Sequence, residues 1–177
     1  MLLKIIQTGD PVLRNGTRDL TREEVRSAVV QQLIEAMRET MRDAPGVGLA
    51  APQVACDLRL AVIEDLVDDP KRDRQPVPFH VLINPRISLG SEEIGHYEGC
   101  LSLDGFQAQV LRAREVRVDA LDHNGDPVNI VAVGWYARIL QHEIDHLDGL
   151  LYIDRMDPRT FTTVRNLSRF HAPPSAG

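Results

Sequence analysis

The chain has 177 residues, of which 43% are hydrophobic, and both values fit one globular domain with a core of its own. Its formal net charge of −6 argues against a nucleic-acid-binding surface as the main function, because such a surface needs clustered positive charge. No run of about 18 apolar residues occurs, so we expect no membrane-spanning helix.

The first predicted helix begins after Thr21, where residues 21–24 match a capping box. Apolar residues then recur at helical spacing and predict one amphipathic helix that ends before Pro45: Val25, Val29, Leu33, Met37 and Met41. Strands are predicted over residues 58–63 and 79–84. The charged, proline-containing stretch 65–78 predicts an exposed and mobile loop.

Two further predicted strands, residues 115–121 and 128–133, flank Asn124-Gly125, a dipeptide typical of a tight hairpin turn. A helix follows the second of them directly. Because strands outnumber helices and run antiparallel, the fold class predicted is α+β. The tail, residues 171–177, is predicted to be disordered.

The last predicted helix contains residues 141–146, with the sequence QHEIDH. Helix positions four apart lie on one face, so His142 and His146 can bind one metal ion, and Glu143 lies beside them as a candidate base. Trp135 and Ile139 share the stripe of the histidines, which predicts that the ligands point inward. An ordinary helix with two unliganded histidines is the alternative.

Cys100, in the segment 98–102, is the candidate third ligand. A catalytic metal of this kind uses three protein ligands and an open position for water, and two histidines leave one ligand missing. Gly99 allows a close approach of the backbone next to the thiol. Cys56 is interpreted as a small buried residue, and a disulfide between the two cysteines is the alternative, which an intracellular location disfavours.

A third motif, residues 46–53 with the sequence GVGLAAPQ, is rich in glycine and alanine. Such small residues indicate close packing around a ligand or another backbone, and Gln53 adds one side-chain amide. A tight turn after the first helix is the alternative.

Together the three motifs resemble those of the peptide deformylases in order and separation, and the similarity runs from about residue 5 to about residue 156. Residues 98–106 and 134–142 resemble the mitochondrial-type subgroup, and we expect a bacterial member of it. The resemblance implies small antiparallel sheets packed around a central metal-binding helix, in a single catalytic domain over residues 1–170. The short start before Gly9 leaves no room for a targeting segment, so we expect a bacterial cytoplasmic enzyme, with a mature organellar form as the alternative.

The resemblance also implies roles. Cys100, His142 and His146 would hold the metal, Glu143 would transfer the proton, and Gln53 with the backbone N–H of Leu101 would stabilise an oxyanion. The reaction would be hydrolysis of the N-formyl amide on the initiator methionine of a new polypeptide, with release of formate. The residues expected to bind substrate are Gly46, Val47, Gly48, Leu49, Glu98, Gly99, Trp135, Arg138 and Ile139.

Three residues depart from many bacterial members, which have a proline in place of Asp104 and aliphatic residues in place of Trp135 and Arg138. The shape of the substrate pocket should therefore differ, with Trp135 and Arg138 in or behind its wall. Supporting roles are expected for Arg112, paired with Glu98, and for Asp145, which would orient a histidine. A solvated surface pair and plain solvent exposure are the respective alternatives.

The implied metal is Fe(II), with Zn(II), Ni(II) or Co(II) as substitutes. Nascent N-formylmethionyl polypeptides are the expected partners, with a transient ribosome contact and without stable nucleic-acid or membrane binding. Two rival functions remain open. A metallopeptidase would need a histidine where Tyr152 stands, and a non-catalytic metal or peptide-binding module with a structural zinc would need a fourth ligand.

Overall fold

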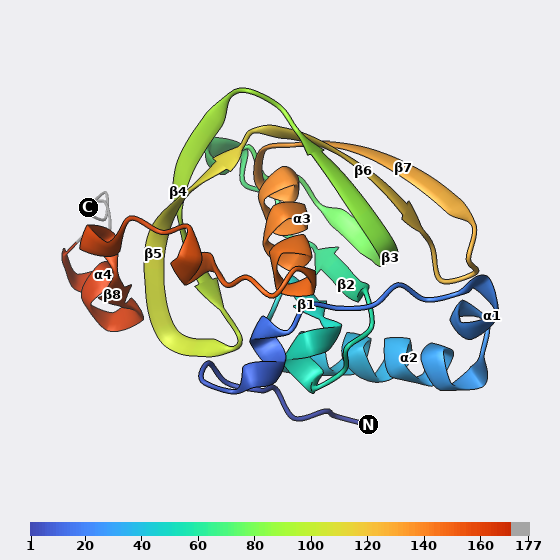
Figure 1. The fold of residues 1–177 in the computed structure, drawn as a ribbon. Helices are drawn as coiled ribbons and strands as arrows, with labels where there is room; N and C mark the ends of the chain where they lie inside the picture. The colour runs from blue at the N-terminus through green and yellow to red at the C-terminus, as the bar shows by residue number, and fades with distance from the viewer. Residues whose placement is uncertain (171–177) are drawn as a thin grey trace.

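In the computed structural model, residues 1–170 are described, and they form four α-helices and eight strands (Figure 1). The helices are α1 (Arg22–Val25), α2 (Ala28–Asp43), α3 (Gly134–Leu147) and α4 (Val164–Phe170). The strands are β1 (Gly48–Ala50), β2 (Leu60–Asp65), β3 (Val77–Leu89), β4 (Glu93–Cys100), β5 (Leu103–Ala113), β6 (Glu115–Leu121), β7 (Pro127–Val133) and β8 (Thr162–Thr163). Short 3-10 helices are η1 (Pro11–Arg14), η2 (Ala51–Val54), η3 (Pro70–Arg72), η4 (Tyr152–Asp154) and η5 (Pro158–Thr160).

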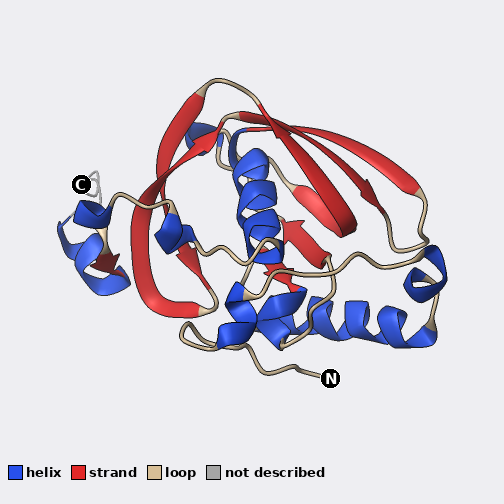
Figure 2. Cartoon of the chain, viewed as in Figure 1, coloured by secondary structure: helices blue, strands red, loops and turns tan. Residues whose placement is uncertain are grey.

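The strands form two antiparallel sheets, one with the order β1-β2-β3-β6-β7 and one with the order β4-β5-β8. Helix α3 lies in the middle of the molecule, between the β4–β5 pair and the five-stranded sheet (Figures 1 and 2). Strands β1 and β4 each end the order of their own sheet, so each has one open edge. The predicted α+β fold, with small antiparallel sheets around the motif helix, is confirmed.

The five-stranded sheet has a core on each face because α2 and α3 cover opposite sides of it. On one side, Ile34 and Met37 of α2 pack against apolar residues of β1, β2 and β3. On the other side, Leu140 and Ile144 of α3 pack against apolar residues of β6 and its neighbours. The motif helix is therefore held by a core along its length, which fixes the direction of the side chains on its remaining face.

The single helix predicted after residue 21 is wrong in one respect, because the chain breaks between α1 and α2. The capping box at Thr21 is present, but α1 ends at Val25, and Ser27 then caps α2 by accepting a hydrogen bond from Val30 N. At the start of α2, Val30 is buried where Val29 was expected, and Val29 is 76% exposed, whereas Met37 and Met41 are buried as predicted.

Strand β6 has the predicted bounds, and β7 begins one residue earlier than predicted, with Gly125 at φ +81° in the turn between them. The predicted strand 58–63 lies at 60–65, and the predicted strand 79–84 is part of the longer β3. Strands β4 and β5 were not predicted.

The stretch 65–78 is largely exposed, as predicted, but it is anchored to the rest of the chain by hydrogen bonds. Asp65 is buried and accepts two hydrogen bonds of 2.7 Å from Arg74. The carbonyl of Asp73 accepts a hydrogen bond from Trp135 N at the start of α3. The predicted tail, residues 171–177, lies outside the described residues. Across residues 1–170, no helix combines the length and apolar character needed to cross a bilayer.

Candidate active site

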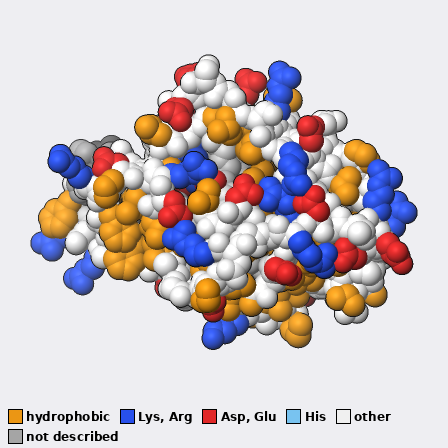
Figure 3. All heavy atoms as spheres, viewed as in Figure 1, with side chains coloured by type: hydrophobic (Ala, Val, Ile, Leu, Met, Phe, Trp, Pro, Cys, Tyr) orange, Lys and Arg blue, Asp and Glu red, His pale blue; other side chains and the backbone are white. Residues whose placement is uncertain are grey.

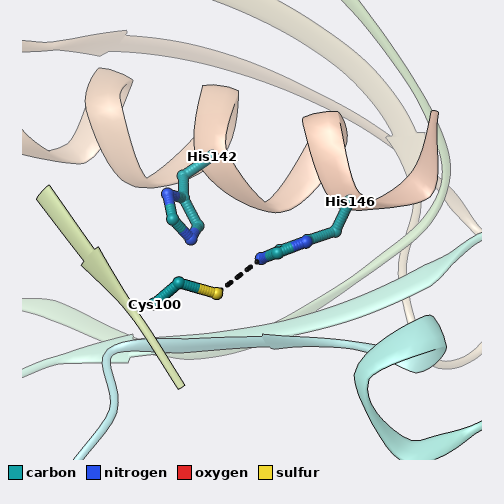
Figure 4. A group of neighbouring side chains, drawn as sticks. All are labelled: Cys100, His142 and His146. Atoms are coloured by element: carbon teal, nitrogen blue, oxygen red, sulfur yellow. Dashed lines mark hydrogen bonds between the residues drawn. The ribbon is translucent and has the colours of Figure 1, made fainter. Parts of the chain in front are cut away.

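Cys100, His142 and His146 converge on one point (Figure 4). The two histidines project from successive turns of α3, and Cys100 is the last residue of β4. The thiol sulfur lies 3.3 Å from His146 Nε2, and the ligand atoms of all three residues lie within 4.8 Å of one another. Tetrahedral bonds of about 2.0–2.3 Å place neighbouring ligand atoms about 3.3–3.7 Å apart, so this nitrogen and sulfur set fits a divalent transition metal.

Both cysteines are free, so the disulfide alternative is wrong. Within residues 1–170, no fourth histidine, cysteine or carboxylate joins the group. A structural zinc site has four protein ligands, whereas three ligands leave a position open for water or substrate. The geometry therefore favours a catalytic metal over a closed structural one.

Glu98 orients His142. Its Oε2 atom lies 3.0 Å from His142 Nδ1, which turns Nε2 of the same ring toward the sulfur of Cys100. A histidine that binds a metal commonly donates its second N–H to a carboxylate in this way. Although burial opposes it, hydrogen bonds from His142 and Arg112 hold the pKa of Glu98 well below its usual range, so this carboxyl group stays ionised.

The expected pair of Glu98 and Arg112 is present and buried, so the alternative of a solvated surface pair is wrong. Arg112 donates from Nε to Glu98 Oε1 and from Nη2 to Oε2, both at 3.0 Å. Asp145 is buried as well, but it accepts hydrogen bonds from Arg112 and Arg155. Its contacts therefore do not orient a histidine directly, in contrast to the expectation, and the alternative of plain solvent exposure is also wrong.

Glu143 points into the space beside the ligand group and is nearly excluded from solvent. Its Oε2 atom has no hydrogen-bond partner within residues 1–170. Burial raises the pKa of Glu143 to about 7, since the charged form loses hydration. Gly48 makes room for this side chain, because a Cβ atom at residue 48 would lie 2.2 Å from Glu143 Oε1.

Gln53 lies in η2, and its amide has a defined orientation. Its Oε1 accepts a hydrogen bond of 2.9 Å from Ala50 N, so the amide nitrogen faces the other way. Nε2 lies 3.1 Å from Ser102 Oγ and 3.5 Å from the sulfur of Cys100. An N–H donor of Gln53 is therefore directed at the ligand group.

A cavity of about 710 Å³ is lined by two of the three ligand residues, Cys100 and His142, whereas His146 is buried next to Cys100 and does not line it. The expected site residues that line it are Gly46, Val47, Gly48, Gln53, Glu98, Gly99, Cys100, Leu101, Trp135, Arg138, Ile139, His142 and Glu143. Leu49 does not line the cavity, because it packs in the core beside α2. A larger cavity of about 860 Å³ borders α2 and β7, and none of the three ligand residues lines it.

Other residues that line the 710 Å³ cavity could not be predicted from sequence, because they come from segments without a motif. Arg72 and Arg74 reach the cavity from the anchored stretch 65–78. At another part of the rim, Phe106 stacks on Phe161 with ring centroids 5.1 Å apart. Figure 3 shows hydrophobic side chains gathered at this end of the molecule, over β5 and α4. Of these residues, only Phe106 lies in a segment, residues 103–113, whose alternation of polar and apolar residues could have predicted a strand.

The α+β fold and the convergent Cys-His-His group beside a buried glutamate define the class of a single-metal hydrolase. The family model described as polypeptide deformylase matches residues 2–162. This chain belongs to the peptide deformylase family, and the expected enzyme class is confirmed.

Individual relatives and a solved structure support the same family. Peptide deformylase 1A, chloroplastic, of Solanum lycopersicum is 49% identical over 92% of this chain, which spans 62% of that protein. Peptide deformylase 3 of Streptomyces avermitilis is 47% identical over 91% of this chain and 74% of its own length. A Met-Ala-Ser-bound structure of a class I type b peptide deformylase from Acinetobacter baumannii superposes with a TM-score of 0.83 at 35% identity, covering 88% of this chain and 99% of that one.

Proposed function

We propose that this enzyme removes the formyl group from the initiator methionine of newly made polypeptides and releases formate. The observation that carries the proposal is the convergence of three metal-binding side chains on one point, with a buried glutamate and an amide donor beside them at the wall of one cavity. Each of these groups corresponds to one step of amide hydrolysis.

Cys100, His142 and His146 are the metal ligands in this proposal. A divalent metal bound there supplies an acidified water molecule and polarises the formyl carbonyl. Mixed nitrogen and sulfur ligation suits several metals. Within the proposal the metal is Fe(II), with Zn(II), Ni(II) or Co(II) as substitutes that the same ligands accept.

Glu143 is the proposed proton carrier. Its carboxylate is buried beside the ligands and has a free oxygen within residues 1–170, so it can accept a proton from the attacking water. The same carboxyl group then donates this proton to the departing amine. Gln53 Nε2 and the backbone N–H of Leu101 are the proposed donors to the oxyanion. Because Ala50 N fixes the amide of Gln53, no reorientation is needed as charge develops.

The open edges of β1 and β4 suit an extended peptide. Gly46, Val47 and Gly48 on one side and Gly99 on the other line the same cavity, so a peptide between them can pair with both strands. Trp135, Arg138 and Ile139 line the cavity from α3 and are the proposed wall of the methionine pocket. Glu98, also expected to bind substrate, lines the same cavity. Leu49 does not line it and would act only through packing.

The rivals have less support. Tyr152 stands where an extended peptidase motif has its third histidine, and its ring stacks on His142 at 6.4 Å without joining the ligand group. A non-catalytic module with a structural metal would need a fourth ligand. Arg112 and Asp145 have supporting roles in the proposal, because they hold Glu98 in place through a shared network of ion pairs.

The proposed partners are nascent N-formylmethionyl chains, met during a transient contact with the ribosome. The proposed location is the bacterial cytoplasm, and the bacterial source of the Streptomyces relative supports the bacterial part of this proposal. The alternative is a mature organellar enzyme, and the relative named chloroplastic is consistent with it.

The test is formate release from formyl-Met-Ala-Ser by the metal-loaded enzyme, with the products separated by mass. Deformylation with the Met-Ala bond intact supports the proposal. Cleavage of internal bonds would identify a peptidase, and metal binding without either reaction would identify a binding module.

A further inference from the structure

Arg138 is a buried arginine whose guanidinium group reaches from α3 to the β4–β5 pair. Its Nη1 donates to Glu98 Oε1 at 2.5 Å and to the carbonyl of Val110 in β5 at 3.0 Å. Its Nη2 donates to the carbonyl of Ile94 in β4. The side chain is 5% exposed. Arg138 therefore binds the same carboxylate that orients His142, although sequence reasoning places it in the pocket wall.

The two oxygens of Glu98 have different partners. Oε2 faces His142 Nδ1 and Arg112, whereas Oε1 faces Arg112 and Arg138. Arg112 alone bonds to both oxygens and is also bonded to Asp145, so its charge is shared between two carboxylates. Within residues 1–170, Glu98 is the sole carboxylate bonded to Arg138. Arg138 thus anchors Oε1 and leaves Oε2 directed at the imidazole.

We propose that Arg138 is a positioning residue that holds Glu98 in the orientation by which Glu98 fixes the His142 ring for metal binding. The inference rests on the metal site of the proposed function. Without Arg138, Oε1 of Glu98 keeps only its bond to Arg112 among residues 1–170, so the carboxylate is free to rotate and the His142 ring loses its fixed acceptor. A carboxylate that orients a metal-binding histidine, as Glu98 does, typically contributes about 10-fold to 100-fold in metal affinity, and loss of Arg138 is expected to remove part of that contribution.

A wall residue and a positioning residue give different results. If Arg138 acts only as pocket wall, its replacement changes KM and side-chain preference and leaves metal affinity unchanged. If it positions Glu98, its replacement weakens metal affinity, even in the absence of substrate. Lysine can bring one charge to Oε1 but cannot reach all three acceptors in the fork geometry of a guanidinium, so we expect partial rescue by lysine.

The experiment compares Arg138→Leu, Arg138→Lys and Arg59→Leu with the wild-type chain. Arg59 is the matched control, since it is a buried arginine that bonds to the carbonyl of Pro85 and to Asp148, away from the cavity. Zn(II) affinity is measured by competition with a chromophoric chelator, and Tm is measured on the metal-free proteins. Turnover of formyl-Met-Ala-Ser by the wild-type enzyme tests the proposed function separately.

We expect Arg138→Leu to bind Zn(II) about 10-fold more weakly, at the low end of the range for loss of the orienting carboxylate itself. Arg138→Lys should lie between this variant and wild type, and Arg59→Leu should lose Tm at unchanged affinity. Should Arg138→Leu not fold, the lysine variant carries the test alone. Wild-type Zn(II) affinity in the folded Arg138 variants, or an equal loss in Arg59→Leu, would overturn the inference, whether or not the enzyme releases formate.

Discussion

Gly48 leaves the space that the Glu143 carboxylate occupies, and Gly48→Ala tests whether this position matters for the reaction. A Cβ atom at residue 48 would lie 2.2 Å from Glu143 Oε1, 2.5 Å from Cδ and 2.8 Å from Cγ. The oxygen must retreat to at least 3.4 Å, ordinary van der Waals contact, which is a displacement of about 1.2 Å. Misplacement of a reacting group by about 1 Å can cost about 100-fold in rate.

We therefore expect kcat/KM of Gly48→Ala to fall by about 10² or more, toward the range of about 10²–10⁴ for loss of a general base. Metal content should stay at the wild-type value, because none of the three ligands is touched. Gly95→Ala is the control, since a Cβ atom there meets only Leu111 Cδ2, at 3.4 Å.

A double-mutant cycle makes the test sharper. If the alanine acts through Glu143, adding it to Glu143→Gln should cost almost nothing further, because the proton carrier is already lost. Deformylation of formyl-Met-Ala-Ser and metal content are measured for all four proteins. A Gly48→Ala enzyme with wild-type kcat/KM, or a full additional loss in the double variant, would refute the reasoning.

The other predictions concern the metal site and the substrate. Glu143→Gln should keep its metal while kcat falls by about 10²–10⁴, and loss of metal together with rate would make Glu143 a ligand. Cys100→Ala should lose both metal and activity, so wild-type metal stoichiometry would exclude the thiol as a ligand. Aerobic handling should inactivate the iron enzyme but spare the nickel or cobalt form; equal kcat/KM for aerobic zinc protein and anaerobic iron protein would contradict Fe(II). Acetyl-Met peptides should lose about 1–3 kcal/mol of transition-state stabilisation relative to formyl-Met peptides, and comparable kcat/KM values would exclude selection by size.

The ligand group could be predicted from sequence because its spacing is local. His142 and His146 share a helix face for any helix, and the hairpin around Gly125 follows from a dipeptide whose backbone preference is strong. The contacts of Asp145 could not be predicted in this way. Its partners, Arg112 and Arg155, come from β5 and from the segment after α3, and no local pattern encodes that meeting.

The strands β4 and β5 could not be predicted from sequence for a different reason. Glycines weaken a strand pattern, although here Gly95 pairs with Leu111 of β5 and Gly99 lies at the register shift between Glu98 and Cys100. The break between α1 and α2 has a similar cause. Ser27 is compatible with a helix interior on spacing alone. Its hydroxyl donates to the carbonyl of Glu24 and accepts from Val30 N, and only these bonds show that it caps a new helix.

The open edges of β1 and β4 affect how many different peptide sequences the proposed enzyme can bind. Strand edges offer only backbone N–H and C=O groups, and every residue except proline carries the same pair. A peptide that pairs with both edges is therefore bound through its backbone and largely independently of its side chains. Within the proposed function, such backbone pairing would suit substrates that differ in every residue after the first, and discrimination would be confined to the first residue and the formyl group on it.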